Sequence, residues 1–299
     1  MKKIPLAFSG CLLGLAGAGN LLSDTFPVLA HFFSLTGLIL WVFFLCHHLI
    51  YWSETKIELQ EPALLSGMAT FPMAGMILST YVFRVFPHLP LVAQGLWWFS
   101  FLLDLTLIAG FTIKFACPGK RVSATPSWTV LYVGIAVAAL TYPLVGIIEI
   151  AYATLSFGFL LTFYLYPLIY SDLKKHPLPL AMLGQEGIYC APFSLLLASL
   201  VRVGGASLPT WVLIVMILAS QYFFFFVLTR LPNILKQGFQ LAFSALTFPT
   251  IITATSLKMA QGILKLPFLD YLVLAETAIC LIILFFVLGA YLIWLRKKV

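Results

Sequence analysis

The sequence Phe248-Pro249-Thr250 interrupts a long apolar stretch of the chain near its middle, and so do Phe71-Pro72-Met73-Ala74-Gly75 and Ala191-Pro192-Phe193-Ser194. Proline removes one backbone hydrogen bond from a helix and clashes with the preceding turn. In a bilayer the freed backbone groups are tolerated only where protein or a water-filled cavity satisfies them. The three segments therefore predict broken helices inside a membrane protein, where they can line a path.

Ten apolar stretches run along the chain, and their composition alternates. The odd-numbered stretches are built from small residues and carry Gly or Pro near the middle, whereas the even-numbered ones are longer, bulkier and more aromatic. The expected spans are 5–22, 27–52, 62–83, 88–114, 127–145, 147–170, 179–201, 208–231, 237–257 and 267–295. The interruptions recur about every 60 residues, at Gly14, Pro72 and Gly75, Gly134, Pro192 and Pro249. The pattern predicts one inner and one outer helix as a hairpin, repeated five times.

Composition places the protein in lipid. The 299 residues are 62% hydrophobic and 9% charged, with a mean hydropathy of +1.06. A soluble domain carries about 25% charged residues, and a spanning helix needs about 20 mostly apolar residues. Because the ten stretches occupy nearly the whole chain, residues 1–299 are expected to form a single all-α transmembrane domain.

Basic residues predict the orientation. With a cytoplasmic N-terminus, 13 of the 17 Lys and Arg residues fall on the cytoplasmic side: Lys2, Lys3, Lys56, Lys114, Lys120, Arg121, Lys174, Lys175, Arg230, Lys236, Arg296, Lys297 and Lys298. The opposite side keeps Arg84, Arg202, Lys258 and Lys265. This separation predicts an even number of spans in the cell membrane, with both termini in the cytoplasm. The scattered basic residues form no patch that would follow a nucleic-acid backbone.

The first stretch has an alternative interpretation. Met1-Lys2-Lys3 and the apolar run that follows resemble a cleavable signal peptide. The Gly-rich composition that this run shares with the other odd-numbered stretches favours a first inner helix instead.

Few basic residues lie within the odd-numbered stretches, so a ring of Lys or Arg is not expected to select anions. Hydroxyls at the breaks and electropositive helix ends would favour anions, and the candidate hydroxyls are Ser9, Thr70, Thr129, Ser194, Thr247 and Thr253. Lys258 would attract anions at a mouth of the path, or it is a lysine that snorkels to the interface. These groups are the expected determinants of selectivity.

Carboxylates inside the stretches favour a second interpretation, because ionisable groups in a membrane are usually functional. Glu186 in the seventh stretch would couple substrate to proton flow in a carrier. Asp104 and Glu276 lie in outer stretches, where contacts between hairpins or subunits explain them.

Enzymatic and metal chemistry is not expected. The five cysteines include no C-x-x-C pair, and H-E-x-x-H, G-x-S-x-G, Walker and Rossmann patterns are missing from the sequence. We therefore expect no cofactor, no bound metal and no catalytic site.

The chain resembles the tellurite-resistance and C4-dicarboxylate transporter family, which includes the slow anion channels of plant guard cells. The best local match is Ala242-Phe243-Ser244-Ala245-Leu246-Thr247-Phe248-Pro249; weaker matches are Phe8-Ser9-Gly10 with Leu13-Gly14-Leu15, Pro126-Ser127-Trp128 and Ala191-Pro192. The resemblance covers essentially the whole chain. It implies a five-fold pseudo-symmetric ring of helical hairpins, assembled as a homotrimer with one pore per subunit.

The resemblance also implies a function. Members of that family pass anions, including chloride, nitrate and dicarboxylates such as malate, and a phenylalanine on the ninth helix closes the pore. The matching residue here is Phe248. An apolar ring across a narrow pore excludes water and ions until it moves aside. The expected function is phenylalanine-gated passage of anions, and the alternative is a proton-coupled dicarboxylate carrier or tellurite-resistance exporter on the same fold.

Overall fold

The protein is described by a computed structural model that covers residues 4–117, 119 and 121–297. Throughout these residues the chain forms helices and short connections, without a strand. The α-helices are α1 (Ser9–Leu21), α2 (Pro27–Ile50), α3 (Trp52–Glu58), α4 (Pro62–Gly67), α5 (Thr70–Val85), α6 (Pro90–Phe111), α7 (Ser127–Gly134), α8 (Val137–Thr141), α9 (Ile148–Lys175), α10 (Ala191–Gly204), α11 (Thr210–Lys236), α12 (Thr247–Leu264) and α13 (Pro267–Lys297). Shorter 3-10 and π segments are η1 (Leu6–Phe8), η2 (Thr112–Ala116), η3 (Tyr142–Leu144), η4 (Leu180–Cys190), η5 (Gly205–Ser207) and η6 (Leu241–Leu246). Of the residues that predict the orientation, Lys2, Lys3, Lys120 and Lys298 lie outside the described part of the chain.

Within the described residues, seven helical segments are long and apolar enough to cross a membrane, and the bent pair α7 and α8 makes an eighth if it is taken as one span. Ten spans are expected from the sequence, and two of the expected stretches form helices that are shorter than a full span or divided. The first stretch forms an apolar helix only over Leu6–Leu21, and the ninth divides into η6 and α12. An interruption within a stretch leaves helices that are individually shorter than a full membrane span.

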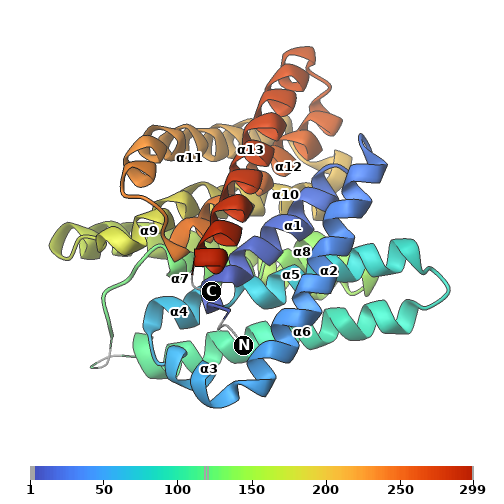
Figure 1. The fold of residues 1–299 in the computed structure, drawn as a ribbon. Coiled ribbons are helices and arrows are strands. Elements are labelled where there is room, and N and C mark those ends of the chain that lie inside the picture. Colours follow the sequence, from blue (N-terminus) through green and yellow to red (C-terminus); the bar gives the residue numbers. More distant parts are fainter. Residues whose placement is uncertain (1–3, 118, 120, 298–299) are drawn as a thin grey trace.

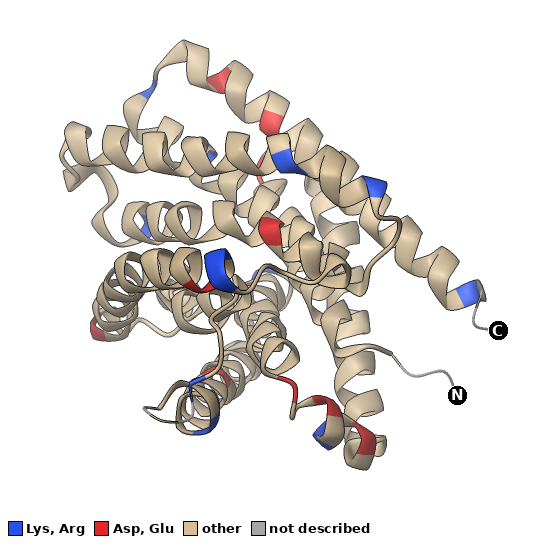
Figure 2. Cartoon of the chain, turned by 90° about the vertical axis from the view of Figure 1, so that its left-hand side faces the viewer, with Lys and Arg blue, Asp and Glu red and all other residues tan. Residues whose placement is uncertain are grey.

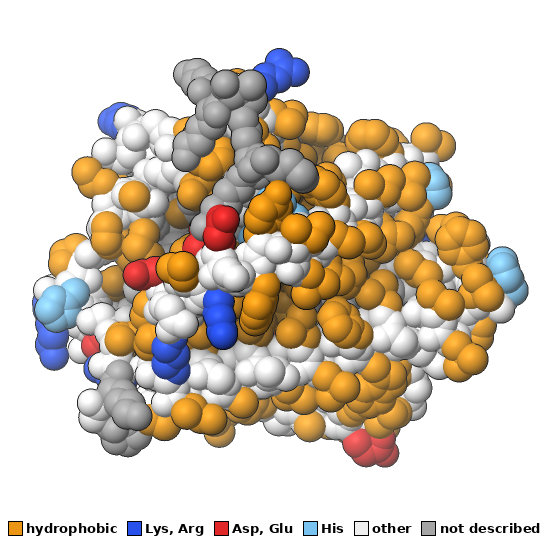
Figure 3. Space-filling model, turned by 60° about the horizontal axis from the view of Figure 1, so that its bottom comes forward, with side chains coloured by type: hydrophobic (Ala, Val, Ile, Leu, Met, Phe, Trp, Pro, Cys, Tyr) orange, Lys and Arg blue, Asp and Glu red, His pale blue; other side chains and the backbone are white. Residues whose placement is uncertain are grey.

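The candidate spans fall into two classes by burial. In Pro62–Val85 and Leu180–Ser207, 67% and 61% of the apolar window is buried inside the protein, whereas the other five helices bury between 28% and 33%. Figure 1 shows those five, α2, α6, α9, α11 and α13, around the outside of the molecule. Many large hydrophobic side chains are exposed, and they are spread over the face shown in Figure 3. Exposed apolar side chains on outer helices of this length are typical of a surface that faces lipid.

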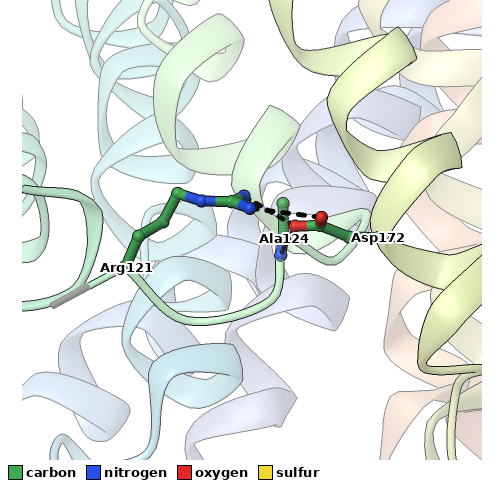
Figure 4. A network of polar contacts seen from close by, with 3 residues as sticks. All are labelled: Arg121, Ala124 and Asp172. Carbon is green, nitrogen blue, oxygen red and sulfur yellow. Dashed lines mark hydrogen bonds and ion pairs between the residues drawn. The ribbon is translucent and has the colours of Figure 1, made fainter. Parts of the chain in front are cut away.

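Charged residues are sparse and lie mostly near helix ends (Figure 2). One buried carboxylate fixes the loop that leads into α7 (Figure 4). Arg121 Nη1 and Nη2 donate to the Asp172 carboxylate at 2.6 and 3.3 Å, and the backbone N–H of Ala124 donates to it at 2.8 Å. The hydrogen bond to Asp172 raises the pKa of Arg121. The end of α9 thereby holds the start of α7 in place.

The helix breaks lie before the prolines and not at them. Pro192 is the second residue of α10, and Pro72 and Pro249 are the third residues of α5 and α12. A proline in the first turn removes no intrahelical hydrogen bond, because the N–H at that position has no intrahelical partner. Each proline thus lies in the first turn of the α-helix that follows an interruption, one or two residues after the first residue of that helix.

The two glycine breaks have different outcomes. Gly134 ends α7, and α8 continues at an angle of 45°. In contrast, α1 runs through Gly14 without interruption, so the break expected there is absent. The change of helix type in this stretch occurs earlier, where η1 passes into α1. A Cβ atom at Gly14 would stand 2.7 Å from Thr247 Oγ1, so this glycine permits close packing of α1 on α12.

The helices that follow the breaks contact one another in a closed order. Helix α1 contacts α5, α5 contacts α8, α8 contacts α10, α10 contacts α12, and α12 contacts α1. Hydrogen bonds also connect neighbouring odd-numbered stretches: Thr70 to Ser9 (2.7 Å), Ser66 to Ser127 (2.7 Å), Ser199 to Ala136 O (2.9 Å), Ser194 with Thr253 (3.0 Å) and Thr247 to Gly10 O (2.9 Å). The partners of the first four bonds are 61, 61, 63 and 59 residues apart. This spacing matches the interval of the interruptions in the sequence.

Candidate functional site

Two cavities lie toward opposite ends of these inner helices. The N-end cavity, of about 360 Å³, is lined by residues near the helix N-termini, and the C-end cavity, of about 660 Å³, by residues near the C-termini. Each inner segment contributes to both, with the N-end residue given first: Leu13 and Asn20 on α1, Met73 and Ile77 on α5, Gly134 and Leu140 on α7 and α8, Leu195 and Arg202 on α10, and Phe248 and Met259 on α12. The two cavities therefore share one set of walls.

A set of buried apolar side chains, called here the barrier, stands on the inner segments at or between the positions that line the two cavities. Four of its residues, Ala16, Val137, Ala198 and Ile252, lie along the chain between residues that line the two cavities. The fifth, Phe248, lines the N-end cavity and belongs to the same hydrophobic cluster. All five are at most 4% exposed. On α10 the barrier spans the turns between Leu195 and Arg202, which is about 10 Å at the rise of an α-helix. These positions are thus occupied by apolar side chains that have almost no exposed surface.

Phe248 stands where the N-end cavity meets the barrier. It is the second residue of α12, lines the N-end cavity and is only 4% exposed. Pro249, the next residue, fixes the first turn of the helix. The ring is thus presented by a helix start and not by the middle of a continuous helix.

Helix N-termini surround the N-end cavity. Residues from the first turns of α1, α5, α7, α10 and α12 line it: Gly10, Thr70, Ser127, Ala191 and Pro249. A helix N-terminus carries a partial positive charge. Most of the remaining lining is apolar, with Glu61, Thr129, Gln185 and Ser244 as exceptions. The cavity thus has partial positive charges from the helix N-termini and, among the lining residues, one charged side chain, Glu61.

The C-end cavity is more strongly charged. Arg84, Arg202, Lys258 and Asp24 all line it. Lys258 Nζ donates to the backbone carbonyl of Leu21 at 2.8 Å and lies 3.7 Å from an Asp24 oxygen. Positive groups therefore outnumber negative ones at this end of the helices.

Comparison with known proteins identifies the family. Residues 3–292 match the sequence model of the voltage-dependent anion channel family. The chain belongs to this family. None of the curated proteins compared with it matches. As a member of the voltage-dependent anion channel family, the protein is a multi-pass membrane protein of the channel and transporter class and not an enzyme. The resemblance to the family of plant slow anion channels is confirmed.

Several residues singled out by the sequence lie at the cavities of this anion channel family member. The N-end cavity is lined by Phe248, Gly134, Pro192, Pro249, Thr70 and Thr129. The C-end cavity is lined by Lys258. The structure thus brings together the ninth-stretch phenylalanine, two of the prolines and two of the hydroxyls.

Other candidates lie away from both linings: Gly14, Pro72, Gly75, Ser194, Thr247, Thr253 and Glu186. Ser194 and Thr253 bond each other, and Thr247 bonds the backbone of Gly10. Glu186 accepts hydrogen bonds from Arg230 Nε and Nη2, each at 2.9 Å. These polar groups connect helices, so their hydrogen-bonding capacity is used within the protein.

Sequence reasoning missed four residues that matter to the geometry. Met73 and Leu195 line the N-end cavity, and Arg84 and Arg202 line the C-end cavity. The two arginines were visible as basic residues on the side opposite the cytoplasm, but nothing in the sequence places them near each other. Met73 is distinguishable only as the residue one position after Pro72.

Proposed function

We propose that the protein conducts anions through a central pore in each subunit and that Phe248 closes this pore. The observation that carries the proposal is the shared lining of the two cavities, with Phe248 in the apolar barrier between them. A hydrophobic constriction excludes ions by excluding water. Displacement of the Phe248 ring from the barrier is the opening step.

The pore belongs, in this proposal, to a pseudo-five-fold ring of ten helices. The closed order of inner contacts supports the ring. The hairpins are supported by contacts between each inner segment and the helix that follows it: α1 with α2, α5 with α6, α8 with α9, α10 with α11, and α12 with α13. Short or broken helices such as α1 and α12 are tolerated as spans, because the surrounding protein satisfies their backbone groups.

Selectivity for anions follows from the five helix N-termini at the N-end cavity. Partial charges stabilise an anion at several positions without trapping it, which conduction requires. Chloride, nitrate and malate are the anions to test.

The assembly and orientation complete the proposal. The single domain of residues 1–299 forms a homotrimer in the cell membrane, with both termini in the cytoplasm. The basic residues support this orientation, and the family resemblance supports the trimer. The N-end cavity then opens toward the cytoplasm, because Arg84, Arg202 and Lys258, on the opposite side, line the C-end cavity.

Anion flux into proteoliposomes tests the gate. We expect Phe248→Ala to raise chloride, nitrate and malate flux by more than tenfold, with little dependence on pH. Phe224→Ala is the matched control, since Phe224 is a buried phenylalanine on outer helix α11. It should lower stability without raising flux. Unchanged flux in Phe248→Ala, together with malate movement in the wild type that follows a proton gradient, would refute the gated pore in favour of a carrier.

A further inference from the structure

Three of the four basic residues assigned to the side opposite the cytoplasm gather in one cavity. Arg84, Arg202 and Lys258 line the C-end cavity, and Lys265 does not. Positive charge on that side runs against the distribution that orients membrane proteins. Its concentration at one end of the proposed pore therefore indicates a role beyond orientation.

Stabilisation of helix ends accounts for part of this arrangement. Arg84 and Arg202 lie in the last turns of α5 and α10, where a cation offsets the partial negative charge of the helix C-terminus. This effect requires one cation at each helix end. It does not require cations from three different helices to line the same cavity of about 660 Å³.

The two arginines also differ from Lys258 in their partners. Lys258 is bonded to Leu21 O and lies near Asp24. In the described ranges of the chain, neither Arg84 nor Arg202 has a carboxylate within ion-pair distance. A guanidinium group presents a planar set of donors that matches a carboxylate. The arginines are therefore the cations available to an incoming anion.

We propose that the C-end cavity is an anion-capture vestibule in which Arg84 and Arg202 enrich anions according to their charge. The inference rests on the proposed conduction pathway and names the residues that discriminate between anions by valence. The positive potential of the cavity raises the local anion concentration. Because the enrichment depends exponentially on the charge of the ion, a divalent anion is enriched by the square of the monovalent factor.

Flux through the open pore tests the vestibule. In a Phe248→Ala background, Arg84→Gln with Arg202→Gln should lower both chloride and malate flux at an ionic strength of about 0.01 M. A chloride loss of about threefold should accompany a malate loss of about ninefold, as the valence rule requires. Both losses should shrink toward none at about 1 M, where the Debye length falls to about 3 Å.

Two sets of variants separate charge from structure. Arg84→Lys with Arg202→Lys keeps the charge and should retain most of the malate flux. Lys265→Gln removes a basic residue next to the end of α12 but outside the cavity lining, and should change neither flux. Equal losses for the two anions, or losses that persist at high ionic strength, would overturn the vestibule.

A binding measurement distinguishes failure of the vestibule from failure of the proposed pore. Malate at low ionic strength should raise the Tm of the purified wild-type protein, because a ligand that binds only the folded state stabilises it. The rise should disappear in the paired Gln variant and persist in Lys265→Gln. If Phe248→Ala raises no flux, the pore proposal fails, and the Tm measurement still tests the vestibule. A malate-induced rise in Tm that the Gln variant loses supports the vestibule. No rise in the wild type overturns it.

Discussion

Gly17 on α1 lies directly against the aromatic ring of Phe248 on α12. A Cβ atom at Gly17 would stand 3.0 Å from Phe248 Cδ2 and 3.3 Å from Cε2. It would also stand 3.1 Å from Ile251 Cγ2. Carbon atoms pack at about 3.5–4.0 Å, so the ring holds its place in the barrier only because residue 17 has no side chain.

Gly17→Ala should therefore push the Phe248 ring out of its position. We expect a rise in basal chloride flux that is smaller than the rise in Phe248→Ala. Gly17→Ala in the Phe248→Ala background should add little further flux, because the ring that the new methyl group would displace is already absent. Proteoliposome flux of the two single variants and the double variant measures this coupling, and independent, multiplying effects would contradict it.

Glu186→Gln tests whether this carboxylate couples transport to protons or only pairs with Arg230. The Arg230 side chain is 42% exposed and water screens the pair, so its loss should cost about 1 kcal/mol or less. We expect a slightly lower Tm and an unchanged pH profile of malate flux. Arg230→Gln should have the same effect on Tm. A pH dependence present in the wild type and lost in Glu186→Gln would favour the carrier.

Asp172→Ala should loosen the loop that leads into α7. The substitution removes the acceptor of Arg121 and of the buried Ala124 N–H. A buried donor left without a partner costs about 1–3 kcal/mol, so Tm should fall and amide exchange in residues 121–126 should quicken. Arg121→Ala should have a smaller effect, because the Ala124 bond remains. Equal effects of the two variants would show that the ion pair alone holds the loop.

Asp104→Ala should raise stability. Asp104 on α6 is fully buried, and within the described residues its carboxyl oxygens have no hydrogen-bond partner. Such a group costs about 1–3 kcal/mol when buried, and its removal should raise Tm despite the small void that remains. Anion flux in the Phe248→Ala background should not change. A fall in both Tm and flux would show that Asp104 has a functional role in the membrane.

Much of the architecture could be predicted because it follows from local chemistry. Burial differs between the aromatic helices and the small-residue segments, as the alternating composition indicated. The breaks also occur near the expected prolines. Their position was wrong by a few residues, because a proline signals a constraint on the backbone without stating whether it ends one helix or starts the next. Only the structure shows that Pro72, Pro192 and Pro249 lie in first turns.

The lining of the cavities could be predicted only in part. Leu13 lines the N-end cavity, whereas its neighbour Gly14 packs against Thr247. One residue corresponds to a rotation of about 100° around a helix, and in a stretch that is apolar on every side no periodicity shows which face points inward. Ser194 and Thr253 were candidates for the path for the same reason, and they bond each other instead.

The sequence by itself determined the solvent, the class of protein and the family, because hydropathy, charge asymmetry and the recurring breaks are properties of short segments. Tertiary structure alone decided which groups meet. It set Phe248 against Gly17, paired Glu186 with Arg230 and brought Arg84 and Arg202 to one cavity. Such meetings depend on the rotation and packing of helices distant in the chain, and a single sequence carries no local signal for them.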